Sequence, residues 1–272
     1  MAAITANAPS AVRGRAGLGG VIRSELTKLK SVRSTWWTVL VLVVLSIGFS
    51  ALICAVIKSS WHNMSASDKA TFDATSTSLG GIGFLGSLVI AVLGALVITA
   101  EYSTGMIRTS LTVMPRRSVM FAAKGLVFGV VALVLSLVLS FVSFFLGQAL
   151  LGDHSASLSH PGTMRAIIGT AIYVTLCGLL AYGIGVLLRH TAGTITLVVG
   201  LLFVLPIIIN LFPSSIHNAI LRWLPTSAGN AISTTVGTTD HMFSAWGEMA
   251  VLGVYVVAIL IAGAMLFRTR DA

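Results

Sequence analysis

The sequence predicts an all-α membrane protein with six transmembrane helices, an N-terminal amphipathic interface helix, and cytoplasmic N- and C-termini. Three observations predict this class: long uncharged apolar segments, a composition too apolar for a soluble domain, and an uneven distribution of Lys and Arg between loops. Of 272 residues, 56% are hydrophobic and only 9% are charged, and the mean hydropathy is +0.97. Soluble domains carry about 25% charged residues. The composition is therefore that of an integral membrane protein rather than of a soluble domain.

Six apolar segments contain no Asp, Glu, Lys or Arg. Each is close to the length of about 20 residues that crosses a hydrocarbon core of roughly 30 Å as a helix. Lipid offers no hydrogen-bond partner to the backbone, so an isolated spanning segment must be helical. The predicted spans are about 36–57, 79–100, 125–151, 166–188, 192–212 and 249–267.

The domain organisation follows from the same segments. Residues 1–17 are rich in Ala, Thr, Ser and Gly and are expected to be a disordered tail, and residues 18–272 are expected to form one transmembrane domain. No hydrophilic segment is long enough for an independent soluble domain. A fused nucleotide-binding domain, kinase or periplasmic enzyme is therefore excluded. The HExxH, GxSxG and GxxxxGK[ST] motifs are also absent from the sequence.

The net charge of +9 has an uneven distribution. With the N-terminus placed inside, 13 of the 17 Lys and Arg residues fall on the cytoplasmic side, including Lys124, which is assigned to the second cytoplasmic loop. Those on the other side are Lys58, Lys69, Arg165 and Arg222. This asymmetry agrees with the positive-inside rule for an even number of spans. The basic excess faces anionic lipid headgroups, so nucleic acid is not needed to explain it.

A basic amphipathic helix is predicted directly before the first span. Over residues 18–34, apolar side chains fall on one arc of a helical wheel and basic or hydroxyl side chains on the other. Such a helix suits the cytoplasmic headgroup layer, and the two tryptophans that follow suit an aromatic belt. The candidate interface residues are Glu25, Lys28, Lys30, Arg33, Trp36 and Trp37.

Glu25 breaks this pattern because it falls inside the apolar arc. A carboxylate in that position needs a cationic partner. One interpretation is a local pair with Lys28 or Lys30. The other is a contact with another loop or subunit.

The second cytoplasmic loop carries the richest pattern outside the spans. It reads EYSTGMIRTSLTVMPRR over residues 101–117. Its glycine permits a sharp turn, residues 106–114 can form a short helix, and the proline ends that helix. A short helix projecting into the cytoplasm is a docking element; an ordinary polar turn anchored by arginines is the alternative. The candidate docking residues are Glu101, Gly105, Ile107, Arg108, Leu111, Pro115, Arg116 and Arg117.

The interior of the predicted bundle has no ionisable side chain in mid-span. Proton- or ion-coupled carriers usually place charged residues there. The absence of ionisable side chains in mid-span favours a transport pathway lined by apolar and small residues, for an amphipathic substrate. The abundant glycines of the spans are interpreted as close helix-packing positions. The spacing of the histidines and of Cys54 and Cys177 predicts neither a metal site nor a disulfide.

The segment 213–249 is expected outside. Pro225, Gly229 and Gly237 break it too often for a span, and Pro206 interrupts the fifth span. One or two short half-inserted helices are predicted there.

Two motifs together resemble the ABC-2-type permeases of ATP-binding cassette exporters, in particular the small stand-alone permeases of actinobacteria. The first is SELTKLKSVRSTWW at residues 24–37, and the second is EYxxGxIR at residues 101–108. The resemblance extends from about Val21 to Arg268. The chain departs from the family pattern at Met106, where the family usually has Thr.

The resemblance implies a permease subunit that exports an amphipathic or hydrophobic substrate (drug, antibiotic, lipid or peptide, as in multidrug or antibiotic efflux). It implies a bacterial plasma membrane protein with six spans, paired with a second permease copy or a paralogue. ATP and Mg bind a separate ATPase subunit, so this chain is neither an enzyme nor a cofactor carrier. Residues 20–34 correspond to the interface helix, 101–117 to the helix that couples to the ATPase, and 213–245 to short re-entrant outer helices.

Two other functions remain open from the residues. One is an ion- or gradient-driven secondary carrier of an apolar solute, and the other is a non-transporting resistance or sensing subunit. Within the exporter interpretation, Glu25 and Glu101 are the candidates for fixing the interface helix against the docking loop.

Overall fold

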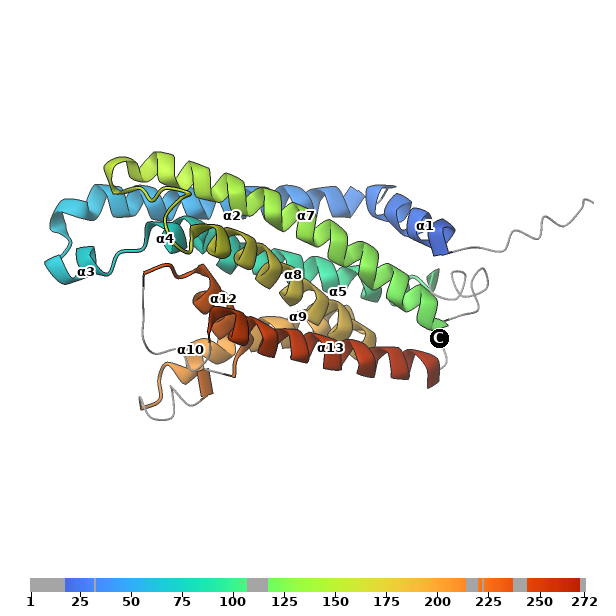
Figure 1. Cartoon of the computed structure of the whole chain (residues 1–272). Helices are drawn as coiled ribbons and strands as arrows, with labels where there is room; N and C mark the ends of the chain where they lie inside the picture. The colour runs from blue at the N-terminus through green and yellow to red at the C-terminus, as the bar shows by residue number, and fades with distance from the viewer. Residues whose placement is uncertain are drawn as a thin grey trace, which may run out of the picture.

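The computed structural model describes residues 18–31, 33–106, 117–213, 220–221, 223–236 and 244–269. Within these residues every regular element is helical and there is no strand. Six helices are long and apolar enough to cross a membrane, which confirms the predicted all-α class with six spans. Figure 1 shows these helices lying side by side in one elongated bundle.

The first, third, fourth and sixth spans are single helices, and the second and fifth are interrupted. The interface helix is α1 (Leu18–Ser31), and the uninterrupted spans are α2 (Arg33–Ser60), α7 (Arg117–Leu151), α8 (Thr163–Leu188) and α13 (Ala245–Thr269). The second span is α4 (Ala74–Gly81), the π-helical turn η2 (Ile82–Gly86) and α5 (Ser87–Ser103). The fifth is α9 (Thr191–Val199), the π-helical turn η4 (Gly200–Val204) and α10 (Leu205–Ile209). The short connecting elements are η1 (Trp61–Asn63), α3 (Ala66–Ala70), η3 (Gly152–His154) and α12 (Pro225–Ser233).

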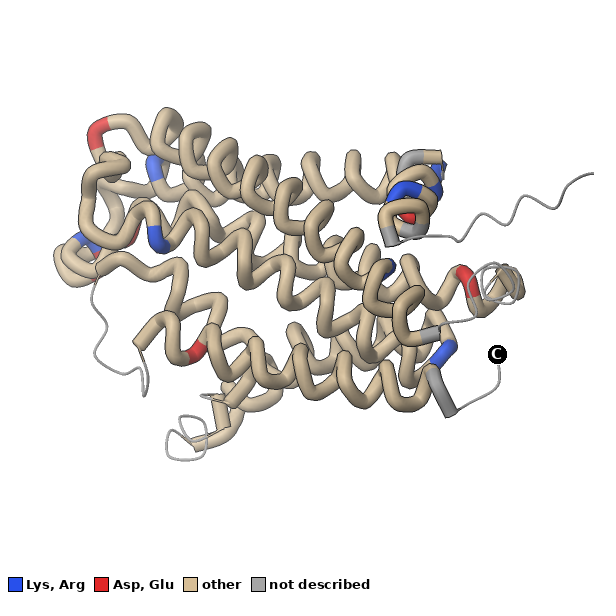
Figure 2. Tube along the Cα trace, turned by 45° about the vertical axis from the view of Figure 1, so that its right-hand side comes forward, with Lys and Arg blue, Asp and Glu red and all other residues tan. Residues whose placement is uncertain are grey.

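The two ends of the bundle differ. One end, called the α1 end below, holds α1, the end of α5, the start of α7 and the end of α13 (Figure 1). The opposite end holds η1, α3, η3 and α12. Charged residues gather at the two ends, with an uncharged stretch between them (Figure 2). This arrangement is the one that a hydrocarbon layer around the middle of the bundle requires.

Helix α8 lies at the centre of the bundle. In its most apolar stretch, 72% of the residues are buried, against 22% in the first, fifth and sixth spans. Glycines permit this, because a Cβ on Gly94 of α5 would lie 2.2 Å from the carbonyl oxygen of Gly178 in α8. Only a residue without a side chain allows two helices to approach so closely. The predicted packing role of the span glycines is met most clearly at this crossing.

Several spans begin earlier than the apolar runs suggested. The second span begins at Ala74 rather than 79, because the Asp73 carboxylate accepts a hydrogen bond from Ser76 N at 2.9 Å and caps the helix. The third begins at Arg117 rather than 125. Lys124, assigned from the sequence to the preceding loop, therefore lies inside α7, and its side chain is buried.

The fifth span is interrupted before Pro206, not at it. The π-helical turn η4 precedes α10, and Pro206 stands in the first turn of α10, where a missing N–H costs little. The helix ends at Ile209 rather than 212. Of the predicted outer helices, α12 is seen; residues 214–219, 222 and 237–243 lie outside the described residues.

Polar contacts hold the chain after α12 against the start of the second and fourth spans. Asp73 accepts hydrogen bonds from Thr235 Oγ1 at 2.9 Å, from Val236 N at 3.1 Å and from Thr235 N. Arg165 of α8 donates to the carbonyl oxygen of Thr234. The segment is thus fixed at the end opposite α1.

The α5–α8 crossing gives a direct test of the packing. We expect Gly94→Ala to lower the free energy of unfolding by about 1–3 kcal/mol, because the new methyl group overlaps the Gly178 carbonyl. The measurement is the apparent melting temperature of the detergent-solubilised chain. Gly253→Ala in α13 is the matched control, since a Cβ there meets nothing within 4 Å. Equal melting temperatures for the two variants would contradict the packing.

Candidate functional site

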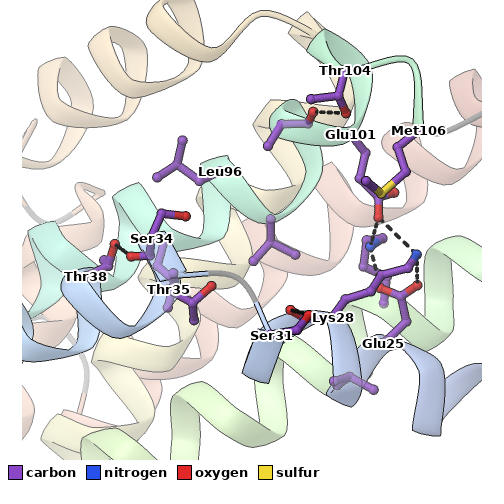
Figure 3. A pocket seen from close by; sticks show the side chains of 15 residues that line it. Glu25, Lys28, Ser31, Ser34, Thr35, Thr38, Leu96, Glu101, Thr104 and Met106 are labelled. Atoms are coloured by element: carbon purple, nitrogen blue, oxygen red, sulfur yellow. Dashed lines mark hydrogen bonds and ion pairs between the residues drawn. The ribbon is translucent and has the colours of Figure 1, made fainter.

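Four charged side chains from three helices meet at the α1 end; together they are called the ion cluster. Glu25 and Lys28 come from α1, Glu101 from the last turn of α5, and Lys124 from α7. Lys28 Nζ lies 2.7 Å from Glu25 Oε1 and 3.2 Å from Glu101 Oε1. Lys124 Nζ lies 2.7 Å from Glu101 Oε1 and also donates to Glu25 Oε2. Figure 3 shows Glu101 pointing from α5 toward Glu25 and Lys28.

Three of the four members of the ion cluster are buried, and the side chain of the fourth, Lys28, is 35% exposed. The exposed fractions are 4% for Lys124, 5% for Glu25 and 7% for Glu101. Two carboxylates face two ammonium groups, so the formal charges balance. Removing one partner of a buried pair leaves an uncompensated charge and costs about 3–5 kcal/mol. The three helices are therefore held in one arrangement by the need to keep these charges paired.

The local sequence explains how α1 contributes two members. Glu25 and Lys28 are three residues apart and lie on the same face of the helix. Glu25 has both kinds of partner considered from the sequence: the local one, Lys28, and one on another element, Lys124. The structure describes the helix at Lys30 but not its side chain.

Charge pairing sets the protonation of the two α1 members. Burial raises the pKa of the Glu25 carboxyl, but the charge of Lys124 and hydrogen bonds from both lysines outweigh it, and the pKa lies below its ordinary value of 4.5. Burial lowers the pKa of Lys28, but its hydrogen bond to Glu25 and the charge of Glu101 outweigh it, and the pKa lies above 10.5. The Glu25 contribution to stability is present above pH 4.5 and is lost as the pH falls through the lowered pKa. The Lys28 contribution is present below pH 10.5 and is lost as the pH rises through the raised pKa, so both persist at neutral pH.

The end of α5 is also joined to the turn between α8 and α9. The guanidinium carbon of Arg189 lies 5.0 Å from the centre of the Tyr102 ring, a cation–π contact. Thr191 Oγ1 donates to Thr99 Oγ1 at 3.0 Å. Arg189 itself ends α8 in the left-handed conformation, with φ at 55°. At the end of α5, Glu101 thus contacts α1 and α7, and the adjacent Tyr102 contacts the α8–α9 turn.

The chain leaves α5 at Gly105. Its φ is 68°, in the left-handed region that favours glycine, and its N–H donates to the carbonyl oxygen of Tyr102 at 3.3 Å. Of the predicted docking residues, the structure describes Glu101 and Gly105 and places Arg117 at the start of α7. The others lie outside the described residues: Ile107, Arg108, Leu111, Pro115 and Arg116. The predicted interface residues Arg33, Trp36 and Trp37 are exposed on the first turns of α2.

A cavity of about 440 Å³ lies beside the ion cluster, between α1, α2, α5 and α7. Hydroxyl groups from the α1–α2 junction line one side and apolar side chains of α5 the other (Figure 3). Glu101 Oε2 is buried beside this space and has no hydrogen-bond partner among the described residues. The described part of the chain holds no group of three His, Cys, Asp or Glu residues that could bind a metal ion.

Sequence reasoning missed one residue and one contact of this arrangement. Lys124 was counted as a loop residue because the apolar run begins after it, and the contact of Tyr102 with Arg189 joins segments far apart in the chain. A signal for Lys124 was present: Glu25 and Glu101 were both unpaired acidic residues next to predicted spans, and Lys124 is a cation beside a third span.

Comparisons with known proteins bear on the same region. The sequence model of one protein family, described as "ABC-2 family transporter protein", matches residues 21–214. This range covers the first five spans and the whole ion cluster. A search of the curated proteins finds no match to the chain.

Removal of Lys124 tests the ion cluster as a structural unit. We expect Lys124→Met to lower the free energy of unfolding by about 3–5 kcal/mol, because it leaves two buried carboxylates with only Lys28 to balance them. Adding Glu25→Gln to that variant restores part of the loss, since the remaining Glu101 and Lys28 charges balance. The measurement is thermal unfolding at pH 7 in detergent.

The matched control is Lys58→Met, which removes an exposed lysine at the opposite end. The ion cluster does not hold the helices together if Lys124→Met and Lys58→Met have the same melting temperature. The same conclusion follows if the double variant loses as much stability as the sum of the losses of Lys124→Met and Glu25→Gln alone.

Proposed function

The chain belongs to the ABC-2 family of transporter proteins, and from this premise we propose that it is the permease subunit of an ATP-driven exporter. A separate ATPase subunit binds ATP and Mg, and a second permease, identical or paralogous, completes the pathway. The substrate is amphipathic or hydrophobic, in the class of drugs, antibiotics, lipids and peptides. The uncharged interior of the bundle supports this class, because a charged substrate or coupling ion calls for charged residues within the spans.

One observation carries the proposal most strongly. The family resemblance assigns ATPase docking to residues 101–117, and Glu101 of the ion cluster is the first residue of that segment. A displacement of that segment therefore moves Glu101. Because Glu101 is paired with Lys28 and Lys124, the displacement passes to α1 and α7 together.

The mechanism follows from this connection. ATP draws the partner ATPases together, and the docked segment 101–117 moves with them. The buried pairs resist separation, so the ends of α1, α5 and α7 move as one body. ATP binding then shifts the bundle between two conformations because it binds one of them more tightly. The α8–α9 turn follows through the contact of Arg189 with Tyr102.

The orientation of the protein completes the proposal. The α1 end faces the cytoplasm of a bacterial cell, and both termini lie there; the excess of Lys and Arg on that side supports this. Arg108, Arg116 and Arg117 then face either acidic groups of the ATPase or lipid phosphates.

Capture of the partner tests the proposal. When the full chain is solubilised from its native membrane and pulled down, we expect a soluble ATPase with a Walker motif to be retained. We expect that ATPase to be lost when residues 105–117 are scrambled, because the docking segment no longer fits its cleft. The measurement is mass spectrometry of the retained proteins.

A scramble of residues 153–161, at the opposite end of the bundle, is the matched control and should leave the ATPase bound. If the chain is recovered alone under conditions that preserve a known transporter complex, the exporter proposal fails. A gradient-driven carrier then becomes the better account.

A further inference from the structure

A second cavity lies away from the ion cluster. Its volume is about 460 Å³, and it is lined by α4, η2 and the start of α5 in the second span, by α8, by η4 and α10 of the fifth span, and by the outer helix α12. Cavities that bind small molecules typically measure about 300–1,000 Å³. The space is thus large enough for a drug-sized molecule within a single copy of this chain.

The walls combine hydrogen-bonding groups with aromatic and aliphatic surface and carry no charge among the residues described there. Eight lining residues carry hydroxyl or amide groups: Ser76, Ser87, Thr170, Tyr173, Asn210, Thr226, Asn230 and Ser233. Phe84 and Phe203 form an aromatic wall, with their ring centres 5.1 Å apart and the rings nearly perpendicular. A charged ligand would lack a counter-ion here, whereas an uncharged ligand with polar groups finds partners.

Both π-helical turns of the described chain border this cavity. Turn η2 contributes Gly83 and Phe84, and turn η4 contributes Leu202 and Phe203. π-Helical turns are rare and occur frequently at functional sites. Two of them, on different spans, facing one cavity are difficult to explain by packing alone.

Thr170 supplies an independent observation. Its side chain is 1% exposed and lines the cavity, yet its Oγ1 has no hydrogen-bond partner among the described residues. Three other buried threonines, Thr99, Thr175 and Thr194, donate to the carbonyl oxygen one turn earlier, as Thr175 does to Ala171 O at 2.8 Å. A buried hydroxyl without a partner costs about 1–3 kcal/mol, and a ligand group in the cavity would remove that cost.

Gly83, one of three glycines at the cavity wall, differs from Gly81, Gly86 and Gly94 of the same span. A Cβ on Gly81, Gly86 or Gly94 would lie within 3 Å of a neighbouring atom, whereas a Cβ on Gly83 meets nothing within 4 Å. Gly83 is therefore not required for helix packing. Its lack of a side chain leaves the cavity open.

We propose that this cavity is a binding site for an uncharged amphipathic molecule with an aromatic body and at least one hydrogen-bonding group. Thr170 bonds the polar group, and Phe84 and Phe203 pack against the aromatic body. That this molecule is the exported cargo rests on the proposed function; the binding site itself does not.

Photolabelling of the full chain in lipid nanodiscs, without any ATPase, tests the site. The probe is an aryl trifluoromethyl diazirine that carries a benzylic hydroxyl group, and the sites of labelling are read by mass spectrometry. We expect saturable labelling of η2, η4 or α12. The benzylic amine analogue, which is charged, is expected to label these elements poorly.

Two variants identify the contacts. Gly83→Leu fills the cavity and is expected to abolish saturable labelling, whereas Gly253→Leu in α13 leaves it unchanged. Thr170→Val keeps the shape of the side chain and is expected to reduce the preference for the hydroxyl probe over its hydroxyl-free analogue about fivefold, the value of one ordinary hydrogen bond.

Labelling that does not saturate, or that Gly83→Leu and Thr170→Val both leave unchanged, overturns the proposal and indicates a space filled by lipid chains. The result is distinguishable from failure of the exporter proposal. Saturable labelling without a captured ATPase supports the binding site and contradicts the assignment of its ligand as exported cargo. A captured ATPase without saturable labelling supports the exporter proposal and contradicts the binding site.

Discussion

The arrangement of the α1 end depends on one constraint: a charge buried in a low-dielectric interior must be paired. Glu25, Glu101 and Lys124 are all nearly inaccessible to solvent, and with Lys28 they form a balanced set. An apolar cluster of the same size would tolerate sliding of one helix past another. Separating these charged groups, in contrast, leaves each of them as a buried charge without a counter-ion. The interface helix and the second and third spans are therefore connected in a way that their apolar surfaces do not provide.

The second span connects the two unusual regions of the molecule. Its α5 part ends at the ion cluster, and its η2 part borders the cavity at the opposite end. Between them, α5 is packed against the central helix α8 at the crossing of Gly94 and Gly178, where the backbones touch. The π-helical turn η2 joins α4 to α5 beside the cavity, and such turns are frequent at functional sites. In the exporter proposal, the ATPase acts on one end of this span and the cargo on the other.

The bundle was predictable from the sequence because a segment within lipid must pair its own backbone hydrogen-bonding groups, which favours an uncharged helix of fixed length. Length and absence of charge identify six spans, and periodicity identifies α1. Glu25 also drew attention as a carboxylate in an apolar arc. Other features were not evident: Lys124 interrupts the apolar sequence of α7, so the uncharged run begins after it, and a π-helical turn such as Ile82–Gly86 has the composition of the α-helix around it. The cavity at η2 and η4 depends on how distant spans pack, which no local pattern records.

In the exporter proposal, the ion cluster carries motion from the ATPase into the permease. The most direct measurement is ATP hydrolysis by the purified complex in lipid, expressed as the ratio of the rates with and without the permease. Glu25→Gln with Glu101→Gln keeps the shapes of both side chains and removes both negative charges, and Arg23→Gln on the exposed face of α1 is the control. We predict that the double variant reduces the effect of the permease on the rate about tenfold, which corresponds to about 1.4 kcal/mol of activation free energy, while it still binds the ATPase. If the ratio of hydrolysis rates is the same for the wild type, the control and the double variant, the ion cluster does not couple the ATPase to the permease.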